Sequence, residues 1–121
     1  MPSGILTFLT DFGRSDAYVA AMKGVALQRA PELRLVDISH EVPPQDVHRA
    51  SYLLSEAAPW FPPGTVHVVV VDPGVGTDRK SIVAVLDDQL IVTPDNGTVS
   101  RLFASSQHRA CFELTHPDLG L

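Results

Sequence analysis

The segment of residues 65–72 constrains the fold of this chain most. It reads TVHVVVVD, an almost continuous run of β-branched apolar residues that ends in an aspartate. Such a run is typical of a strand covered on both faces, and strands of this kind occur in parallel sheets that lie between layers of helices. The segment therefore predicts a central strand of a mostly parallel α/β sheet.

The rest of the chain alternates between strand-like and helix-like patterns. Apolar and β-branched residues predict further strands at 5–10, at 33–39, on either side of 87–89 within 81–94, and at 110–115. Helical spacing predicts helices within 15–31, 43–59 and 96–106, the first capped by Ser15. The stripes behind the first two are Tyr18, Met22, Val25 and Arg29, and Val47, Ala50, Ser51 and Leu54. We expect an α/β fold, a three-layer, mostly parallel sheet flanked by helices, with one antiparallel hairpin around 87–89.

Composition and charge narrow the class of protein. A chain of 121 residues, 45% of them hydrophobic, is long enough for one compact domain with a single core. There are 14 acidic and 9 basic residues, which give a net charge of −5 without a basic stripe and argue against a nucleic-acid partner. The first residues lack a basic stretch, and no apolar run reaches the roughly 20 residues that span a bilayer. We therefore expect a cytoplasmic protein with no membrane partner.

Neither a disulfide nor a metal site is indicated. Cys111 is the single cysteine, and the histidines lack the spacing of zinc ligands. His40 closes a predicted strand and His67 lies inside one, so we expect both to make local or core hydrogen bonds rather than to bind a ligand. Trp60 and Phe61 lie between prolines and are expected to cap the core, with Trp60 as the wall of a ligand pocket the less favoured alternative.

Four aspartates fall at or near the carboxyl ends of predicted strands, where open α/β sheets place their ligand crevice. They are Asp11, Asp37, Asp72 and Asp95. For Asp37 and Asp95 a role in a turn or cap is favoured, because aspartate is common at such positions. For Asp11 and Asp72 a role in a site is favoured.

The loop DPGVGTDR, residues 72–79, could be a phosphate cradle, a methyl-donor site or a sharp turn. A phosphate loop ends in Gly-Lys-Ser/Thr, which is missing here, and a methyl-donor loop leads into a helix, whereas this one leads into a strand. Two interpretations of Asp72 and Arg79 remain: an ion pair that braces the loop, or a carboxylate kept ionised by arginine that orients a water molecule. PDNG at 94–97 predicts a plain turn. DFG at 11–13 has no room before it for the other kinase motifs.

Six motifs taken together resemble one known family. They are LTDFG at 9–13, YVAAMKG at 18–24, DISHEV at 37–42, FPPGTVHVVVVDPGVGT at 61–77, Arg79, and PDNG at 94–97. In this order they resemble the S-adenosyl-L-methionine hydrolase (adenosine-forming) family, the SAM hydroxide adenosyltransferase branch related to fluorinase and chlorinase. The motifs extend over almost the whole chain, whereas each alone would be weak evidence.

The resemblance implies hydrolysis of S-adenosyl-L-methionine (SAM) to adenosine and L-methionine by attack of water or hydroxide on the ribose C5′ carbon. Asp11 then looks like the carboxylate that accepts the two ribose hydroxyls. Asp72 and Arg79 look like two members of a water-activating Asp, Arg, His triad. Halogenating relatives do not keep this Asp and Arg pair, so its presence favours the hydrolase. SAM is the substrate, and the resemblance implies neither a cofactor nor a metal.

The chain departs from the family pattern in two ways. The triad histidine belongs to a Thr-Phe-His-Gly-Arg-Asp motif that does not occur in these 121 residues, and His116 does not match it. Family members also continue into a β-rich domain and form homotrimers with sites between subunits. We therefore expect residues 1–121 to be the N-terminal α/β domain without the C-terminal β-rich domain, and to be inactive alone. The alternatives are a non-catalytic domain that binds an adenosine-type ligand or a partner subunit, and a chain without any ligand.

Overall fold

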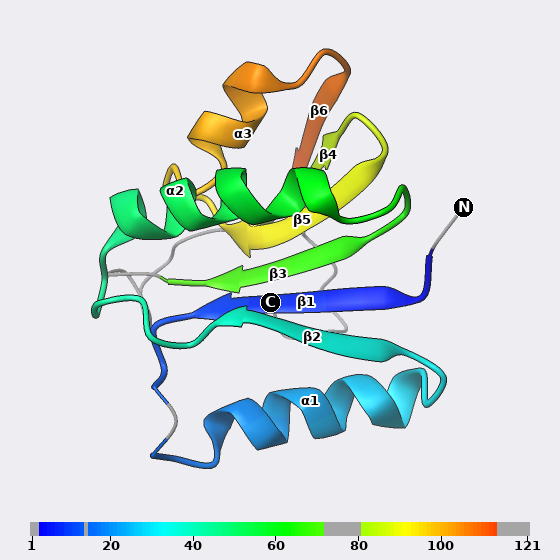
Figure 1. The fold of residues 1–121 in the computed structure, drawn as a ribbon, viewed down its shortest axis with the longest axis vertical. Helices are drawn as coiled ribbons and strands as arrows, with labels where there is room; N and C mark the ends of the chain where they lie inside the picture. Colours follow the sequence, from blue (N-terminus) through cyan, green and yellow to red (C-terminus); the bar gives the residue numbers. More distant parts are fainter. Residues whose placement is uncertain (1–2, 14, 72–80, 114–121) are drawn as a thin grey trace.

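The computed structural model describes residues 3–13, 15–71 and 81–113. Its elements in chain order are β1 (Ile5–Thr10), α1 (Tyr18–Arg29), β2 (Arg34–Ser39), α2 (Val47–Ala57), the short 3-10 helix η1 (Ala58–Trp60), β3 (Val66–Val70), β4 (Ser81–Leu86), β5 (Gln89–Pro94), α3 (Ser100–Ser105) and β6 (Arg109–Glu113). Figure 1 shows these elements as one sheet with its helices. Among the described residues, no helix combines the length and the apolar composition needed to cross a membrane.

The six strands form one sheet in the order β2-β1-β3-β5-β4-β6. The pairs β1 with β2, β1 with β3, and β3 with β5 are parallel. β4 runs antiparallel to both of its neighbours, β5 and β6. The predicted mixed α/β sheet is therefore confirmed, with β4 and β5 as the hairpin. The pairing of β6 with β4 adds a second antiparallel pair, because the chain crosses from α3 to the free side of β4.

The hairpin turn is shorter than expected. Only Asp87 and Asp88 lie outside the ladder, since Leu86 pairs with Gln89 and Gln89 already belongs to β5. Asp87 adopts a φ of 54°, a left-handed conformation that aspartate tolerates better than most residues. The Asp87 carboxylate accepts the backbone N–H groups of Gln107 and His108, which fixes the chain before β6.

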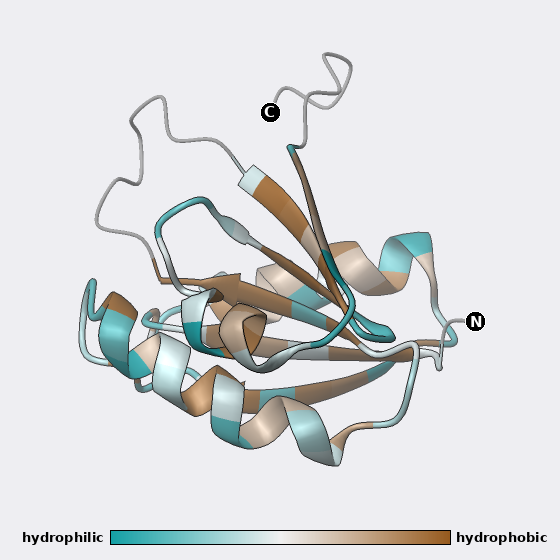
Figure 2. Cartoon of the chain, turned by 90° about the horizontal axis from the view of Figure 1, so that it is seen from above, coloured by the Kyte–Doolittle hydropathy of each residue, from teal (hydrophilic) through white to brown (hydrophobic). Residues whose placement is uncertain are grey.

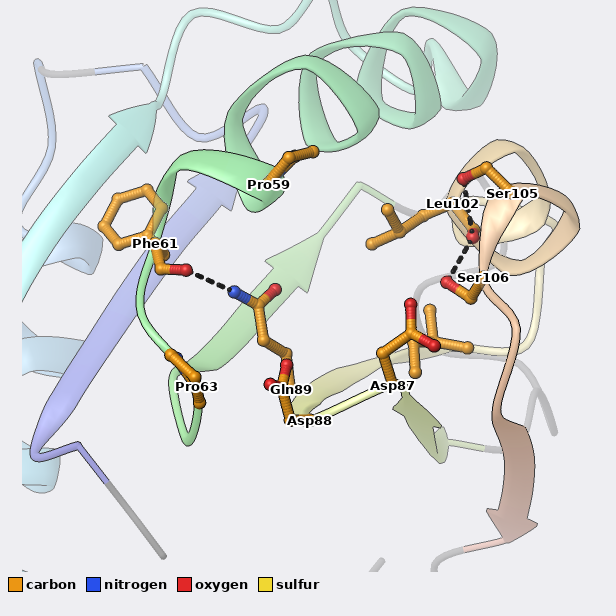
Figure 3. Close-up of a pocket in the computed structure, with 10 residues that line it drawn as sticks. Pro59, Phe61, Pro63, Asp87, Asp88, Gln89, Leu102, Ser105 and Ser106 are labelled. Carbon is orange, nitrogen blue, oxygen red and sulfur yellow. Dashed lines mark hydrogen bonds between the residues drawn. The ribbon is translucent and has the colours of Figure 1, made fainter.

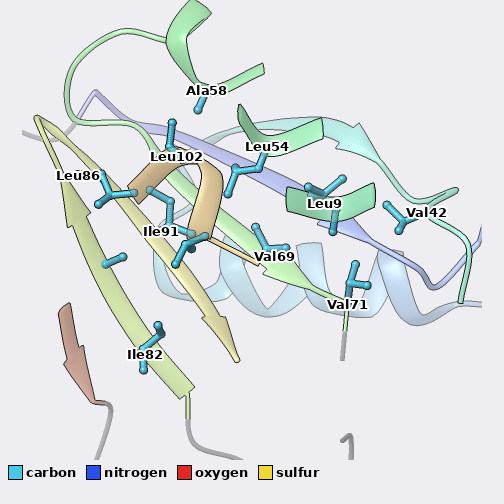
Figure 4. Close-up of a cluster of buried hydrophobic side chains, with 13 residues drawn as sticks. Leu9, Val42, Leu54, Ala58, Val69, Val71, Ile82, Leu86, Ile91 and Leu102 are labelled. Carbon is cyan, nitrogen blue, oxygen red and sulfur yellow. The ribbon is translucent and has the colours of Figure 1, made fainter. Parts of the chain in front are cut away.

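The helices form two layers on opposite faces of the sheet. Figures 1 and 2 together place α2 and α3 on one face and α1 on the other. One hydrophobic core fills the space under α2 and α3 (Figure 4), and its buried members are Leu9, Val42, Ala50, Leu54, Ala58, Val69, Val71, Ile82, Ala84, Leu86, Ile91, Val99 and Leu102. Burial of a side chain the size of Leu54 contributes about 1.5–3 kcal/mol, so this face supplies much of the stability.

The two long helices differ in how well the sequence predicts them. In α2 the predicted stripe is confirmed, because Ala50, Ser51 and Leu54 are buried. Asp46 caps this helix by accepting the backbone N–H of Arg49 at 2.9 Å. The predicted cap of α1 is wrong: that helix begins only at Tyr18, preceded by Ala17 without a side-chain cap.

The stripe predicted for α1 is not a buried face. Tyr18 and Val25 are 66% and 59% exposed, and no residue of α1 is fully buried. The expectation that Trp60 caps the core is also wrong, because its side chain is 88% exposed. Phe61 is half-buried and contacts the His67 ring edge-on, with the two ring centres 5.5 Å apart.

Candidate active site

The parallel strands β1, β2, β3 and β5 all end at one side of the molecule, which we call the carboxyl end of the sheet. Asp11 directly follows β1 there and is half-buried. Its Oδ2 atom accepts the backbone N–H of Gln45 at 2.8 Å. Among the described residues we find no hydrogen bond to its other carboxylate oxygen. Asp11 is thus an oriented carboxylate with acceptor capacity left for a ligand.

Gln45 adopts an unusual backbone conformation where it meets Asp11. Its φ of 63° lies in the left-handed region, which costs a residue with a side chain roughly 1–2 kcal/mol. Gln45 follows Pro43 and Pro44, and the N–H of Asp46 bonds back to the carbonyl of Pro43 at 3.0 Å. This tight turn directs the Gln45 N–H at Asp11. Strain of this kind is often found next to functional groups.

A chain of polar contacts with a buried centre lies beside Asp11. His40, 2% exposed, places Nδ1 2.7 Å from the Thr10 hydroxyl and Nε2 2.8 Å from Asp37. Asp37 also accepts from the Lys23 ammonium at 2.7 Å, which ties α1 to β2. Burial raises the pKa of Asp37, but the hydrogen bonds from Lys23 and His40 outweigh burial and hold that pKa below its ordinary value. The expectation that His40 hydrogen-bonds locally is confirmed, and Asp37 has a structural role as an ion pair rather than as a turn or cap.

The PDNG turn lies at the same end of the sheet, after β5. Gly97 has a φ of 87°, the left-handed conformation expected of this motif. The Asn96 amide donates to the carbonyl of Val71 at 2.7 Å, and its oxygen accepts from the backbone and hydroxyl of Thr98. Asn96 therefore fixes the backbone at Val71, directly after β3 and one residue before Asp72. The predicted turn is confirmed, and its asparagine has a positioning role that the sequence analysis did not assign.

Asp72, Arg79 and His116 lie outside the described residues, so the water-activating roles of Asp72 and Arg79 stay predictions. The described residues include Val71, which immediately precedes Asp72 in the sequence. Val71 is fully buried and its carbonyl accepts from Asn96, so the residue before Asp72 is held at the carboxyl end of the sheet. Asp11 leaves the neighbouring strand β1 at the same end, because β1 and β3 are parallel and Thr10 pairs with Val70.

The sequence alone could not identify Thr10, Gln45 and Asn96 as supports of this site. Their partners are distant in sequence or are backbone atoms, and only the strand register brings them together. A weak signal exists for Thr10, which is fully buried, polar and immediately precedes Asp11 at the end of an apolar strand. Polar residues in that position need partners, and such partners often serve a site.

The opposite end of the sheet holds a second polar network. Gln89 donates to the carbonyls of Ala58 and Phe61, both at 3.0 Å, so its oxygen faces His67 Nε2, also at 3.0 Å. His67 Nδ1 lies 2.6 Å from the Thr7 hydroxyl. Burial lowers the pKa of His67, and the bond to Gln89 opposes this only in part. The prediction of a satisfied core histidine is confirmed.

A cavity of about 360 Å³ lies next to this second network (Figure 3). It opens between η1, the β4–β5 turn and α3, and it is lined by Phe61, Asp87, Asp88, Gln89 and Leu102 among others. Phe61 and Gln89 lie at the amino ends of β3 and β5, at the opposite end of the sheet from Asp11. The cavity is therefore separate from the candidate site. No group of three potential metal ligands occurs in the part of the chain that the structure describes.

Several known proteins are similar to this chain in sequence. The family model described as the SAM hydroxide adenosyltransferase N-terminal domain matches residues 6–120. The (R)-S-adenosyl-L-methionine hydrolase of Salinispora tropica is 43% identical over 118 residues, which are 97% of this chain and 45% of that protein. A fluorinase of an Actinoplanes species is 33% identical over 78 residues, 64% of this chain and 26% of that protein.

A solved structure supports the same relationship. The crystal structure of an uncharacterized conserved protein from Thermotoga maritima superposes with a TM-score of 0.89 at 41% identity, and covers 94% of this chain and 44% of that one. The chain thus spans about half the length of the hydrolase and the structure that it matches. Because the family model covers nearly every residue, the chain belongs to the SAM hydroxide adenosyltransferase family and corresponds to its N-terminal domain.

Proposed function

We propose that the protein hydrolyses SAM to adenosine and L-methionine, and that this chain supplies the N-terminal part of the site. The observation that supports the proposal best is Asp11. It is a half-buried carboxylate at the carboxyl end of a parallel sheet, oriented through one oxygen by the Gln45 N–H. The more extensive likeness to the relative named as a hydrolase than to the one named fluorinase favours water over halide as the nucleophile.

In this proposal Asp11 accepts the two ribose hydroxyls of SAM. Two hydrogen bonds to one ionised carboxylate fix the sugar ring and hence the direction of the C5′ to sulfur bond. The Gln45 N–H keeps the carboxylate from rotating. The ribose is therefore held before the reaction begins, which reduces the entropy that is lost on reaching the transition state.

Water attacks C5′ from the side opposite the sulfur. The new bond joins the water oxygen to C5′, the C5′ to sulfur bond breaks, and its electron pair leaves with methionine as a neutral thioether. The water loses one proton to the surrounding solvent, which balances the positive charge that the sulfonium gives up. Because the leaving group is already a good one, the reaction needs no general acid, and we propose that it uses no cofactor and no metal. We assign to Asp72 and Arg79 the task of holding the water at the ~3–3.5 Å of a near-attack geometry.

The assembly belongs to the same proposal. This chain spans 45% of the Salinispora hydrolase, so further residues of the site can come from the part of a full-length protein that this chain does not include. We propose a homotrimer of the full-length protein, acting in the cytoplasm, with the remaining site residues contributed by a second domain and a neighbouring subunit. Analytical ultracentrifugation of the full-length protein tests the trimer.

The test of the activity is chromatography of a reaction of the full-length protein with SAM in excess chloride. We expect adenosine and methionine in equal amounts. A 5′-halogenated adenosine as the main product would contradict the hydrolase assignment. Binding of adenosine without any turnover of SAM would instead support the non-catalytic alternative.

A further inference from the structure

Both flanks of Asp11 are bonded to a single buried residue. On one side, the hydroxyl of Thr10 lies 2.7 Å from His40 Nδ1. On the other side, the backbone N–H of Gly13 donates to the His40 carbonyl at 2.8 Å. The loop of residues 11–13 therefore begins and ends on His40. We call these two bonds the His40 clamp.

The loop is also bonded within itself. The N–H of Phe12 donates to the Thr10 hydroxyl oxygen at 3.2 Å. The same oxygen lies 2.7 Å from His40 Nδ1, so one hydroxyl is bonded both to the loop and to the imidazole. Nε2 of His40 donates to one oxygen of the Asp37 carboxylate, and the other oxygen accepts from Lys23. Both ring nitrogens of His40 have a partner, so the imidazole cannot turn without breaking two hydrogen bonds.

We propose that His40 is a positioning residue for Asp11. This inference rests on the proposed function, in which Asp11 binds the ribose hydroxyls of SAM. His40 acts through Thr10 and Gly13: by fixing the backbone on both sides of Asp11, it holds the carboxylate where the Gln45 N–H meets it. A carboxylate that is ordered before the ligand arrives loses less entropy on binding, so the clamp strengthens ribose binding.

The chain provides its own control for this proposal. His67 and Thr7 form a second buried pair, 2.6 Å apart, between the neighbouring strands β1 and β3. That pair ends on the amide of Gln89, whereas the His40 pair ends on a carboxylate. In the part of the chain that the structure describes, no hydrogen bond joins the Thr7 hydroxyl to the loop of residues 11–13. Thr10→Val and Thr7→Val thus delete the same group from two buried threonine–histidine pairs, only one of which supports Asp11.

The first measurement is steady-state kinetics of SAM hydrolysis by the full-length protein. Thr10→Val should raise KM by about tenfold with a smaller change in kcat, because the loss of one or two hydrogen bonds acts on ribose binding. Thr7→Val should leave KM and kcat unchanged at a temperature where both variants are folded. If Thr10→Val does not fold, Asp37→Ala takes its place, since that carboxylate is one-third exposed.

The second measurement does not depend on activity. Hydrogen exchange of the Gly13 amide, followed by NMR, should be at least about fivefold faster in Thr10→Val than in wild type and unchanged in Thr7→Val. The Gly13 bond to His40 is not itself removed by the substitution, so faster exchange reports loosening of the whole clamp.

The outcomes separate this inference from the proposed function. Suppose that Gly13 exchange is faster in Thr10→Val but not in Thr7→Val, and that the wild-type protein forms no adenosine. The His40 clamp is then supported, whereas the proposed function is contradicted. Equal effects of Thr10→Val and Thr7→Val on exchange and KM would overturn the inference. An active enzyme whose Gly13 exchange rises in Thr10→Val without any change in KM would also overturn it, because the clamp would then not position Asp11.

Discussion

Replacement of Asp11 by asparagine removes a negative charge from the carboxyl end of the sheet and leaves the size of the side chain unchanged. The amide oxygen of asparagine can still accept the Gln45 N–H that Asp11 accepts at 2.8 Å. The atom left for the ligand is then an uncharged NH₂ group. Asp11→Asn therefore tests the ribose role of the carboxylate with little effect on the fold.

The size of the effect follows from the bonds that are lost. Hydrogen bonds to a charged group contribute roughly 1.5–3 kcal/mol. At about 1.4 kcal/mol for each factor of ten, we expect adenosine to bind the full-length Asp11→Asn protein ten- to hundredfold more weakly than the wild type. Isothermal titration calorimetry measures both dissociation constants. Asp88→Asn is the matched control, because Asp88 is exposed in the β4–β5 turn at the opposite end of the sheet.

A second ligand makes the test specific for the hydroxyls. With 2′,3′-dideoxyadenosine, wild type and Asp11→Asn should bind about equally weakly, because the partner of the carboxylate is then missing in both. In a double-mutant cycle the two losses would be strongly non-additive. Losses that simply add would refute the assignment of Asp11 to the ribose hydroxyls, even if adenosine binding falls as expected.

Three further predictions follow from the same account. Asp72→Asn in the full-length protein should lower kcat by far more than it weakens adenosine binding, and equal losses in Asp72→Asn and Asp11→Asn would contradict the division of roles. Folding stability should fall as the pH drops below about 6.5. The pKa of His67 is lower in the folded than in the unfolded state, so the unfolded state takes up the proton first. Urea unfolding at several pH values should show this slope, and His67→Gln should reduce it. Residues 1–121 alone should show the circular dichroism of a folded α/β domain but form no adenosine, and clear turnover would show that the rest of the family's site is dispensable.

The sheet could be predicted from the sequence because the burial of a strand is reflected in the residue types of that strand. The run at 65–72 is β-branched enough to mark a central strand, and the structure places β3 in the middle of the sheet. The stripe of α2 was predictable for the same reason, since Ala50 and Leu54 face the core. In α1 the predicted buried stripe was wrong, because that helix has no fully buried residue. The helix is instead linked to β2 by the ion pair of Lys23 with Asp37.

The supports of the site could not be predicted, because they depend on register. His40 and His67 look alike in sequence, yet their threonine partners lie 30 and 60 residues away, and only the parallel alignment of β1 with β2 and β3 selects them. The left-handed turn at Gln45 is equally hidden, since glutamine has no preference for that conformation. Residue types thus predicted a ligand site at the carboxyl end of the sheet, whereas the contacts around Asp11 could be found only from the fold.

Water as the nucleophile at C5′ is the central claim, and isotope labelling tests it most directly. The full-length protein is incubated with SAM in oxygen-18-labelled water, and the products are analysed by mass spectrometry. We predict that the label enters the 5′-hydroxyl of adenosine and that methionine stays unlabelled, because the C5′ to sulfur bond is the one that breaks. Unlabelled adenosine, or label in the methionine portion, would contradict the account.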